Sequence, residues 1–361
     1  MKNKIVSEGI TFDDVLLLPG HTDFKRADVS LTTVLHPRIS LRLPLLSSPM
    51  DTVTEESMAT SLALAGGLGI IHRNLSIPDQ AAMVSGVKRK NLFVGAAVGI
   101  GADLEERVKA LVKTSADLLV IDSGHGDTEF MAEAVRWIRK TYPKQIIMAG
   151  NVATRSGAKR LIEAGADILR VGMGPGSICT TRIITGMGVP QLTAVTEAVK
   201  AAKGTKVTVV ADGGIKQIGD MAKALGMGAH AVMAGSLLAG FDESPGELVA
   251  IDGKKYKQYR GMGSVGAMKK GSAERYGQTK DTSSRKLIAE GVEGLVAYKG
   301  AVVDYLDQVT GSLTSAFYYI GARTLPEFHK SARFVRITPA SLAESHPHNI
   351  VVSNAGSNYT T

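Results

Sequence analysis

The chain is poor in cysteine, with a single residue of this kind, Cys179, among 361. One cysteine cannot form an intrachain disulfide, and it cannot supply the several thiolates of a structural zinc site. The lone thiol is therefore either a small side chain packed in the core or a nucleophile. Its neighbours in the sequence decide between the two.

Long apolar runs are also missing. No uninterrupted run approaches the roughly 18 residues that a helix needs to cross a bilayer. The first residues, MKNKIVSEGITFDD, contain no apolar segment of the kind found in secretory signals. We therefore expect no membrane span and a cytoplasmic location. The hydrophobic content of 44% and the 40 glycines are typical of a soluble globular protein, and the length suits one large domain.

Aromatic side chains make up only 5% of the chain, and acidic residues are outnumbered by basic ones, which leaves a formal net charge of +8. Because the basic residues are scattered and few aromatic rings are present to stack on bases, a nucleic-acid partner is not expected. The KRK run at 88–90 keeps a nucleic-acid-binding protein as an alternative, which a steep loss of affinity with salt would reveal. The densest basic cluster, Lys269, Lys270, Arg275 and Lys280, lies in a Gly/Ser-rich stretch and predicts a mobile loop near a small anion.

Eight short apolar runs, rich in β-branched residues, alternate with stretches of helical periodicity. The runs are LPLLSS (43–48), LGII (68–71), LFVGAAV (92–98), DLLVIDS (117–123), QIIMAGN (145–151), DILRVG (167–172), KVTVVADG (206–213) and HAVMAG (230–235). Amphipathic helical patterns follow the third, fourth, fifth and sixth runs, at 104–114, 130–142, 155–166 and 192–203. This alternation predicts a (β/α)8 TIM barrel of class α/β, formed by a single domain over 1–361.

Three segments lie outside that repeat. The stretch SGVKRKN at 85–91 is predicted to be a turn between the second helix and the third strand. The Gly- and Lys-rich stretch 241–300 follows the eighth strand, and we expect it to fold over the barrel mouth, with a flap at about 252–300. The polar tail from about 338 has too little apolar content to pack alone, so it is either disordered or docked on a neighbouring subunit.

The sixth loop, GMGPGSICTTR at 172–182, places Cys179 among three glycines and a proline. Active sites of such barrels lie at the carboxyl ends of the strands, where this loop is expected. Its glycines can expose backbone amides to a phosphate or backbone carbonyls to a monovalent cation, and Ser177 adds a hydroxyl. A partly exposed thiol in this setting is typical of a nucleophile.

Two further loops at the same end suit a phosphorylated ribose. Asp212-Gly213-Gly214 follows the seventh strand, and Gly235-Ser236 follows the eighth. In barrels of this kind these two loops recurrently bind phosphate. The carboxylate of Asp212 can accept hydrogen bonds from both hydroxyls of a ribose.

Seven runs resemble the inosine monophosphate dehydrogenase and guanosine monophosphate reductase family. They are GITFDDVLLLP (9–19), SSPMDTVTE (47–55), GNVAT (150–154), VGMGPGSICTTR (171–182), ADGGI (211–215), YRGMGS (259–264) and EGVEGLVAYKG (290–300). The resemblance extends from about residue 5 to the end of the chain, and the cysteine loop is its most specific part. The family's usual pair of regulatory cystathionine-synthase-like (CBS) modules is missing, and by the resemblance it would have been at about 86–91.

The resemblance implies a reaction. Cys179 would attack C2 of the hypoxanthine ring of inosine monophosphate (IMP), hydride would pass to NAD, and water would release xanthosine monophosphate from the covalent thioimidate. In the dehydrogenases a flap carries an Arg-Tyr pair that acts on this water, and Arg275-Tyr276 matches the pair. A guanidinium with a pKa above about 12 is a poor base. The resemblance therefore leaves two options: Tyr276 and Thr181 share the proton network, or Arg275 is transiently neutral.

The resemblance also implies the residues that contact each nucleotide. The substrate contacts would be Ser48 and Met50 lining the site, Asn151 and Arg170 near the reacting ring, Ser177, Asp212, Gly213, Gly214, Gly235, Ser236 and Tyr259 around the ribose phosphate, Gly261, Met262 and Gly263 along the base, and Glu290 on the purine edge, where it could also relay a proton. Asp122, Ser123 and Gly124 would hold the nicotinamide ribose of NAD, close to Gly172, and Tyr319 would lie at the adenosine end.

A potassium ion and a homotetramer are further implications of the resemblance. The ion would be bound by carbonyl groups of Gly174, Gly176 and Cys179 in the cysteine loop. The tail motif Glu344-Ser345-His346 of an adjacent subunit would complete the site. This role would explain why a polar tail is ordered.

Three stretches depart from the family pattern. DSGHGD (122–127) stands in place of Asp-Thr-Ala-His-Gly-His, LVAYKG (295–300) in place of Arg-Val-Pro-Tyr-Lys-Gly, and SAFYYIG (315–321) in place of Ser-Gly-Met-Gly-Tyr-Cys-Gly. All three bear on the contacts with NAD. The alternative within the family is an NADPH-dependent guanosine monophosphate reductase, whose deamination needs no activated water and whose flap lacks the Arg-Tyr pair. Arg275-Tyr276 favours the dehydrogenase.

Overall fold

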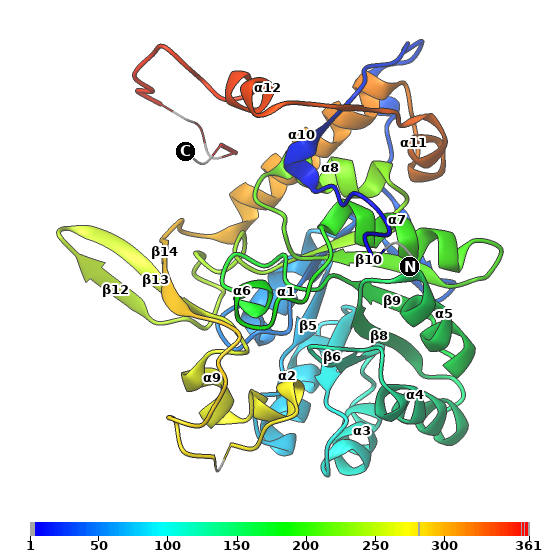
Figure 1. The fold of residues 1–361 in the computed structure, drawn as a ribbon, viewed down its shortest axis with the longest axis vertical. Coiled ribbons are helices and arrows are strands. Elements are labelled where there is room, and N and C mark those ends of the chain that lie inside the picture. Colours follow the sequence, from blue (N-terminus) through cyan, green and yellow to red (C-terminus); the bar gives the residue numbers. More distant parts are fainter. Residues whose placement is uncertain (1–3, 281, 355, 357, 360–361) are drawn as a thin grey trace.

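The computed structural model describes residues 4–280, 282–354, 356 and 358–359 of the chain. Its centre is a closed barrel of eight parallel strands (Figure 1). The strands are β4 (Leu45–Ser47), β5 (Leu68–Ile71), β6 (Val94–Val98), β7 (Leu118–Asp122), β8 (Ile146–Val152), β9 (Ile168–Val171), β10 (Thr208–Asp212) and β11 (Ala231–Ala234). Each pairs in parallel with the next along the chain, and β11 pairs with β4, which closes the barrel. The eight predicted strands and the fold class are confirmed.

Helices cover the outside of the barrel and connect its strands (Figure 1). They are α1 (Glu56–Leu64), α2 (Ile77–Lys88), α3 (Leu104–Lys113), α4 (Glu129–Thr141), α5 (Arg155–Ala164), α7 (Gln191–Ala202) and α8 (Ile218–Gly226). The four helices predicted from periodicity are confirmed as α3, α4, α5 and α7. At the starts of α2, α4 and α5, the hydroxyls of Ser76, Thr128 and Thr154 accept a hydrogen bond from the amide three residues later. These caps satisfy amides that have no partner inside the helix.

A hairpin fills the amino-terminal end of the barrel. β2 (Thr33–His36) pairs antiparallel with β3 (Ile39–Leu41), and the fully buried Leu35 packs with barrel-interior residues such as Leu46. The hydroxyl of Thr208 donates a hydrogen bond to the carbonyl oxygen of Leu35 at 2.8 Å. Because this end is filled with apolar side chains, the carboxyl end of the strands is the one available to a ligand.

Two segments near the ends of the chain pair on the outside of the barrel. β1 (Val15–Leu17) pairs antiparallel with β15 (Phe334–Arg336). The remaining elements of these segments are the short turns η1 (Phe12–Asp14) and η2 (Arg26–Asp28) and the helices α10 (Val302–Ile320), α11 (Leu325–Ser331) and α12 (Pro339–Glu344). This pairing holds residues near the start of the chain against the segment that follows α11.

The stretch after β11 forms a separate layer beside the barrel mouth. β12 (Leu248–Ile251), β13 (Lys254–Arg260) and β14 (Glu293–Ala297) make a three-stranded antiparallel sheet. Between β13 and β14 lie α9 (Val265–Lys270) and η3 (Ser272–Tyr276). Met268 of α9, Ala273 of η3 and the following Leu287 form a small apolar cluster. We call residues 265–280 and 282–289 the flap. It has an apolar cluster of its own, distinct from the main core.

The turn predicted at 85–91 is wrong in its first half, because α2 continues to Lys88. Gly86 lies within this helix, where α2 packs closely on α1: a Cβ at this position would lie 2.2 Å from Glu56 Oε2. The glycine thus permits a close helix contact rather than a turn. A tertiary contact of this kind overrides the local signal of the sequence.

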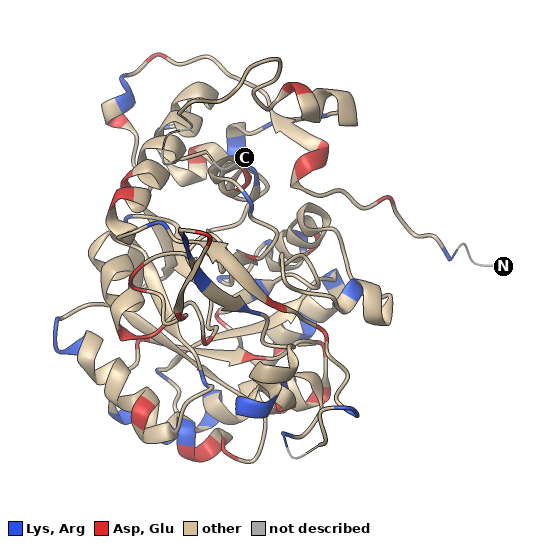
Figure 2. Cartoon of the chain, turned by 90° about the vertical axis from the view of Figure 1, so that its left-hand side faces the viewer, with Lys and Arg blue, Asp and Glu red and all other residues tan. Residues whose placement is uncertain are grey.

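Charged residues of both signs lie over the surface, and the polar tail is exposed. Lys and Arg are interspersed with Asp and Glu over the elements seen in Figure 2. Within the part of the chain that the structure describes, no helix combines the length and apolar character needed to span a membrane. The tail beyond α12 is exposed from Glu344 to Asn354. Its docking on a neighbouring subunit stays a prediction.

Candidate active site

A cavity of about 400 Å³ opens at the carboxyl ends of the barrel strands. Its lining includes residues of β8 and β9, of the loops after β4, β7, β9, β10 and β11, and of the segment 259–290. All fifteen residues predicted to contact the substrate line it: Ser48, Met50, Asn151, Arg170, Ser177, Asp212, Gly213, Gly214, Gly235, Ser236, Tyr259, Gly261, Met262, Gly263 and Glu290. Cys179, Thr181, Arg275 and Tyr276 line it as well. The structure therefore brings the predicted catalytic and substrate residues to one place.

The cysteine loop runs from the end of β9 to α6 (Thr181–Thr185), close to the loop after β10. Gly172 has φ of 151°, and a Cβ there would lie 2.2 Å from the carbonyl oxygen of Asp212. The glycine is therefore required by both the backbone conformation and the close approach. Cys179 is partly exposed, and its amide donates to the carbonyl oxygen of Gly176 at 3.0 Å.

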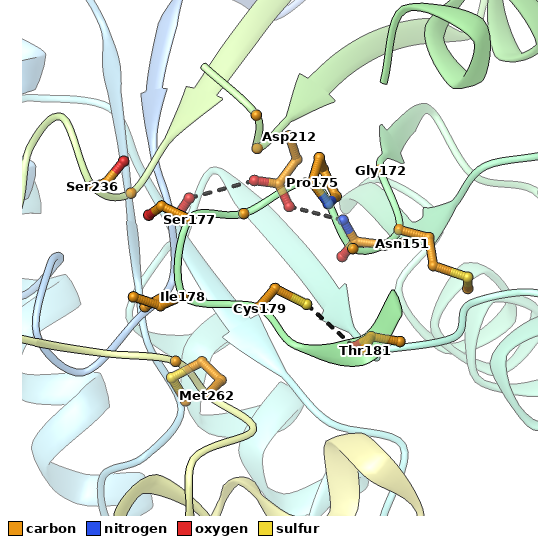
Figure 3. Close-up of a pocket in the computed structure, with 18 of the residues that line it drawn as sticks. Asn151, Gly172, Pro175, Ser177, Ile178, Cys179, Thr181, Asp212, Ser236 and Met262 are labelled. Carbon is orange, nitrogen blue, oxygen red and sulfur yellow. Dashed lines mark hydrogen bonds between the residues drawn. The ribbon is translucent and has the colours of Figure 1, made fainter. Parts of the chain in front are cut away.

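Two hydrogen bonds link the thiol to a carboxylate. Cys179 Sγ lies 3.2 Å from Thr181 Oγ1, as Figure 3 shows. Thr181 Oγ1 in turn donates to Glu290 Oε2 at 2.8 Å. Because the threonine hydroxyl has only one proton, its lone pairs face the thiol, which becomes the donor. The arrangement can carry a proton from Cys179 through Thr181 to Glu290.

Asp212 is held by three side chains of the barrel. Its Oδ2 accepts hydrogen bonds from Arg170 Nε and from Asn151 Nδ2, each at 2.8 Å. Among the described residues, its Oδ1 has only a long contact, 3.5 Å, with the hydroxyl of Ser48. One carboxylate oxygen is thus fixed by the protein, while the other can accept further hydrogen bonds from a ligand.

Tyr259, on β13, places a neutral hydroxyl beside the loop after β11. Burial raises the pKa of its phenol, and hydrogen bonds from Ser177 and Ser236 only partly offset this. A Cβ at Gly235 would lie 3.0 Å from the phenolic oxygen, so this glycine makes room for the ring. A neutral hydroxyl, two serine hydroxyls and glycine amides form an environment of donors that suits an anion.

Arg275 and Tyr276 reach into the cavity from the flap. The Arg275 guanidinium forms an ion pair with Asp122 and lies with Nη2 3.4 Å from Asn151 Oδ1. Burial lowers the pKa of Arg275, while the neighbouring Tyr276 opposes this effect. Burial also raises the pKa of Tyr276. The raised pKa keeps Tyr276 neutral beside Cys179, whereas for Arg275 burial weakens the charged form and the ion pair with Asp122 favours it.

The residues predicted to bind NAD are only partly available. Gly124 and Gly172 line the cavity, but Asp122 is 2% exposed and lies between the guanidinium groups of Arg170 and Arg275. The amide of Gly124 donates to the carbonyl oxygen of Arg275 at 3.0 Å. The flap therefore occupies the space beside the turn that was assigned to the nicotinamide ribose. Ser123 is buried, and Tyr319 on α10 is 64% exposed and does not line the cavity.

The residues predicted for potassium fall into two groups. Gly174, Gly176 and Cys179 lie together in the cysteine loop and line the cavity. Gly174 has φ of 75°, a conformation that favours glycine, and a cation there would be bound by carbonyl oxygens. Glu344, Ser345 and His346 are exposed in the same chain and line no part of the cavity. This separation fits a site shared between chains and leaves the metal prediction open.

Sequence reasoning assigned no role to Arg182, although it belongs to the cysteine motif. Its Nη2 donates to the carbonyl oxygens of Met173 at 3.3 Å and Val189 at 2.6 Å. The side chain thus ties the start of the cysteine loop to the segment between α6 and α7. Its position in the motif was the available signal, but the spacing alone does not reveal which carbonyls it binds.

The sequence model of the family described as "IMP dehydrogenase / GMP reductase domain" matches residues 9–348. The chain belongs to this family. The match covers the barrel, the cysteine loop and the flap, and it extends into the tail. This is the family that the seven sequence runs predict.

Proteins named inosine-5'-monophosphate dehydrogenase are similar over nearly the whole chain. That of Borreliella burgdorferi is 42% identical over 400 residues, which cover 97% of this chain and 99% of the relative. Those of Halalkalibacterium halodurans and Staphylococcus aureus are 37% identical over 485 residues and 36% over 486, and each alignment covers 99% of both chains. Because these two alignments are longer than the 361-residue chain, both relatives contain residues that this member of the family lacks.

Proposed function

We propose that this chain oxidises IMP to xanthosine monophosphate with NAD, through a covalent adduct at Cys179, as a step of guanine nucleotide synthesis. The observation that carries the proposal is the meeting of Arg275-Tyr276 with the hydrogen-bonded series Cys179, Thr181 and Glu290 in one cavity. The names of the relatives support the same activity. A reductase would need the nucleotide site and the thiol but not a flap pair that activates water.

The substrate is expected to lie with its phosphate towards the loops after β10 and β11. Gly214, Ser236 and Tyr259 offer donors there, Gly213 lies beside them, and the Oδ1 of Asp212 would face the ribose hydroxyls. The purine would then extend over Cys179, between the cysteine loop and the backbone of 261–263. Cys179 is in the partly exposed position that nucleophilic attack requires.

The first step forms a bond between Cys179 Sγ and C2 of the purine. The thiol proton leaves through Thr181 to Glu290, which the two hydrogen bonds of 3.2 and 2.8 Å allow. The C2–H bond breaks as the thiolate adds, and its electron pair departs as hydride. When bound, NAD accepts this hydride. Asn151 and Arg170 border the reacting ring and hold Asp212 in place.

The second step breaks the C2–S bond by hydrolysis. Water adds to C2, its proton passes to a base, and the thiolate leaves. Once Glu290 has released the thiol proton to solvent, it is one acceptor for the water proton, through Thr181, and a transiently neutral Arg275, whose pKa burial lowers, is another. Tyr276 lies next to both groups in the cavity. The flap would thus supply the base after the nicotinamide has gone, because Arg275 and the nicotinamide ribose both need the turn at Asp122 and Gly124.

A potassium ion would be held by the carbonyl groups of Gly174, Gly176 and Cys179, with the tail of a neighbour in a homotetramer completing the site. When bound, the ion would stabilise the conformation of the cysteine loop. We place the absent CBS modules at about 86–91, across the last residues of α2 and the turn that follows. None of the cavity residues lies there, so catalysis should survive their absence.

The test is absorbance at 340 nm with IMP, NAD and potassium. We expect NADH to accumulate with the natural chain, and no NADH with Cys179→Ser. Consumption of NADPH with guanosine monophosphate, together with silence towards IMP, would contradict the proposal and make the chain the reductase of the family.

A further inference from the structure

Arg73, which follows β5, lies buried at the mouth of the barrel, where its side chain faces the flap. Its side chain is 6% exposed, and its Nη1 lies 3.7 Å from Oε2 of Glu274, whose side chain is 48% exposed. Glu274 directly precedes Arg275 in η3. The barrel and the flap are thus joined by an ion pair one residue away from the proposed base.

Two glycines in the loop after β6 make room for this pair. A Cβ at Gly99 would lie 2.7 Å from Arg73 Nη1, and a Cβ at Gly101 would lie 2.3 Å from Glu274 Oε2. Both charged groups therefore rest on the backbone of one loop. This loop belongs to the barrel. Its contact with Glu274 therefore fixes the position of η3 against the barrel.

A second carboxylate is available to Arg73 from the same loop. Asp103 Oδ2 accepts a hydrogen bond from Arg107 Nε at 2.7 Å, whereas its Oδ1 is buried and has no hydrogen-bond partner among the described residues. Burial lowers the pKa of Arg73 and the charge of Arg107 adds to this effect, while the carboxylates of Glu274 and Asp103 both oppose it. The guanidinium therefore lies in the field of two acids, one on the flap and one on the barrel.

We propose that Arg73 is a positioning residue that holds the flap closed through Glu274 and pairs with Asp103 when the flap opens. The inference rests on the proposed function, because flap movement matters only if the flap and NAD use the same turn in succession. Leaving a buried guanidinium unpaired is costly. A partner that stays on the barrel lowers this cost and keeps opening reversible. Glu274 in turn places the backbone of Arg275, whose carbonyl oxygen accepts from the amide of Gly124.

The first experiment measures flap opening without catalysis, by limited trypsin digestion. Lys280, Arg285 and Lys286 are exposed cleavage sites in or beside the flap, and the fragments are identified by mass spectrometry. When opening is fast relative to cleavage, the cleavage rate reports the population of the open form. A half-exposed ion pair contributes little, so we expect Glu274→Gln to raise cleavage in the flap by about three-fold.

Matched variants separate the ion pair from a general effect of charge. Arg73→Gln should raise cleavage to the same extent as Glu274→Gln, the double variant should be no faster than either, and Arg73→Lys should restore the natural rate. Asp103→Asn removes the partner of the open form, so cleavage should slow. Asp252→Asn, an exposed acid in the β12–β13 turn with φ of 49°, should change nothing.

Kinetics provide the second readout. Loss of the pair should leave the rate of the first NADH turnover unchanged and slow the later turnovers by about three-fold, because only hydrolysis needs the closed flap. The proposal is overturned if the effects of Arg73→Gln and Glu274→Gln multiply in the double variant, or if Glu274→Gln leaves cleavage unchanged. If the chain makes no NADH at all, the proposed function fails, while the digestion still decides whether Arg73 and Glu274 act together.

Discussion

The barrel wall and the flap wall of the cavity are held in place by different forces. The strand that leads into the cysteine loop, β9, is buried over its whole length. The flap instead meets the barrel through polar contacts, such as Asn74 Nδ2 to the carbonyl oxygen of Ala267 at 3.3 Å and Arg73 to Glu274 at 3.7 Å. Polar contacts exchange with water or ligand at a small net free energy, whereas buried apolar area does not. One cavity therefore has a fixed wall and an exchangeable wall.

The largest expected effect concerns the fixed wall. Cys179→Ser removes the nucleophile, and we expect kcat with IMP to fall by more than about a thousand-fold. Mass spectrometry of the quenched reaction should show no adduct on the chain. The thermal midpoint should be unchanged because the side chain is partly exposed. Activity that survives in this variant would remove the thiol from the mechanism.

A substitution in the flap wall should slow only the second step of the reaction. Arg275→Ala should give a first turnover of NADH at the natural rate, followed by a steady state about a hundred-fold slower, because the base for hydrolysis is lost. Rapid-mixing absorbance at 340 nm resolves the two phases. Lys280→Ala, an exposed basic residue in the same flap, is the control and should behave like the natural chain. Equal slowing of both phases would show that Arg275 does not act on the second step.

Acid should destabilise the barrel around His230, just before β11, and should leave the flap unchanged. His230 Nδ1 accepts from the amide of Val209 at 3.2 Å, and burial, together with His329, lowers the pKa of His230 to about 4. An unfolded histidine titrates near 6.5, so between about pH 6.5 and 4 the unfolded chain binds more protons and stability falls as the pH falls. The loss from His230 should reach about 2 kcal/mol at pH 5.

Urea unfolding at pH 7 and pH 5 measures this loss. His230→Asn keeps an acceptor for the Val209 amide but does not titrate, so its unfolding free energy should depend less on pH. The same dependence in both chains would show that the buried histidine is not responsible. Trypsin cleavage of the flap at pH 7 should be identical in the two.

The smallest effect is expected at the phosphate end. Tyr259→Phe removes one neutral donor from an otherwise unchanged wall, and we expect KM for IMP to rise by about five- to ten-fold with kcat nearly unchanged. Initial rates over a range of IMP concentrations give both constants. Tyr256→Phe on the same strand is the matched control, because Tyr256 does not line the cavity. A fall in kcat alone would place Tyr259 in the chemistry instead.

Much of the fixed wall could be predicted because its signals are local. The runs of β-branched residues mark the strands, and the glycines around Cys179 mark the loop that follows β9. Asp212 was assigned to a ligand from its place after a strand, and its Oδ1 is the oxygen left with only a long contact. The pairing of Asp122 with Arg170 and Arg275 was not predicted, since these residues lie on three separate segments.

The sequence by itself determined the barrel, the position of the thiol at its mouth and the presence of an Arg-Tyr pair in a polar insertion. These follow from periodicity and from the chemistry of short motifs, which need only neighbours in the chain. The tertiary structure alone decided that Arg275 meets Asp122, that Glu274 meets Arg73, and that Gly86 lies in a helix rather than a turn. Such contacts depend on how the barrel closes and on how the insertion folds back over it. No local pattern contains the distance between residues so far apart in the chain.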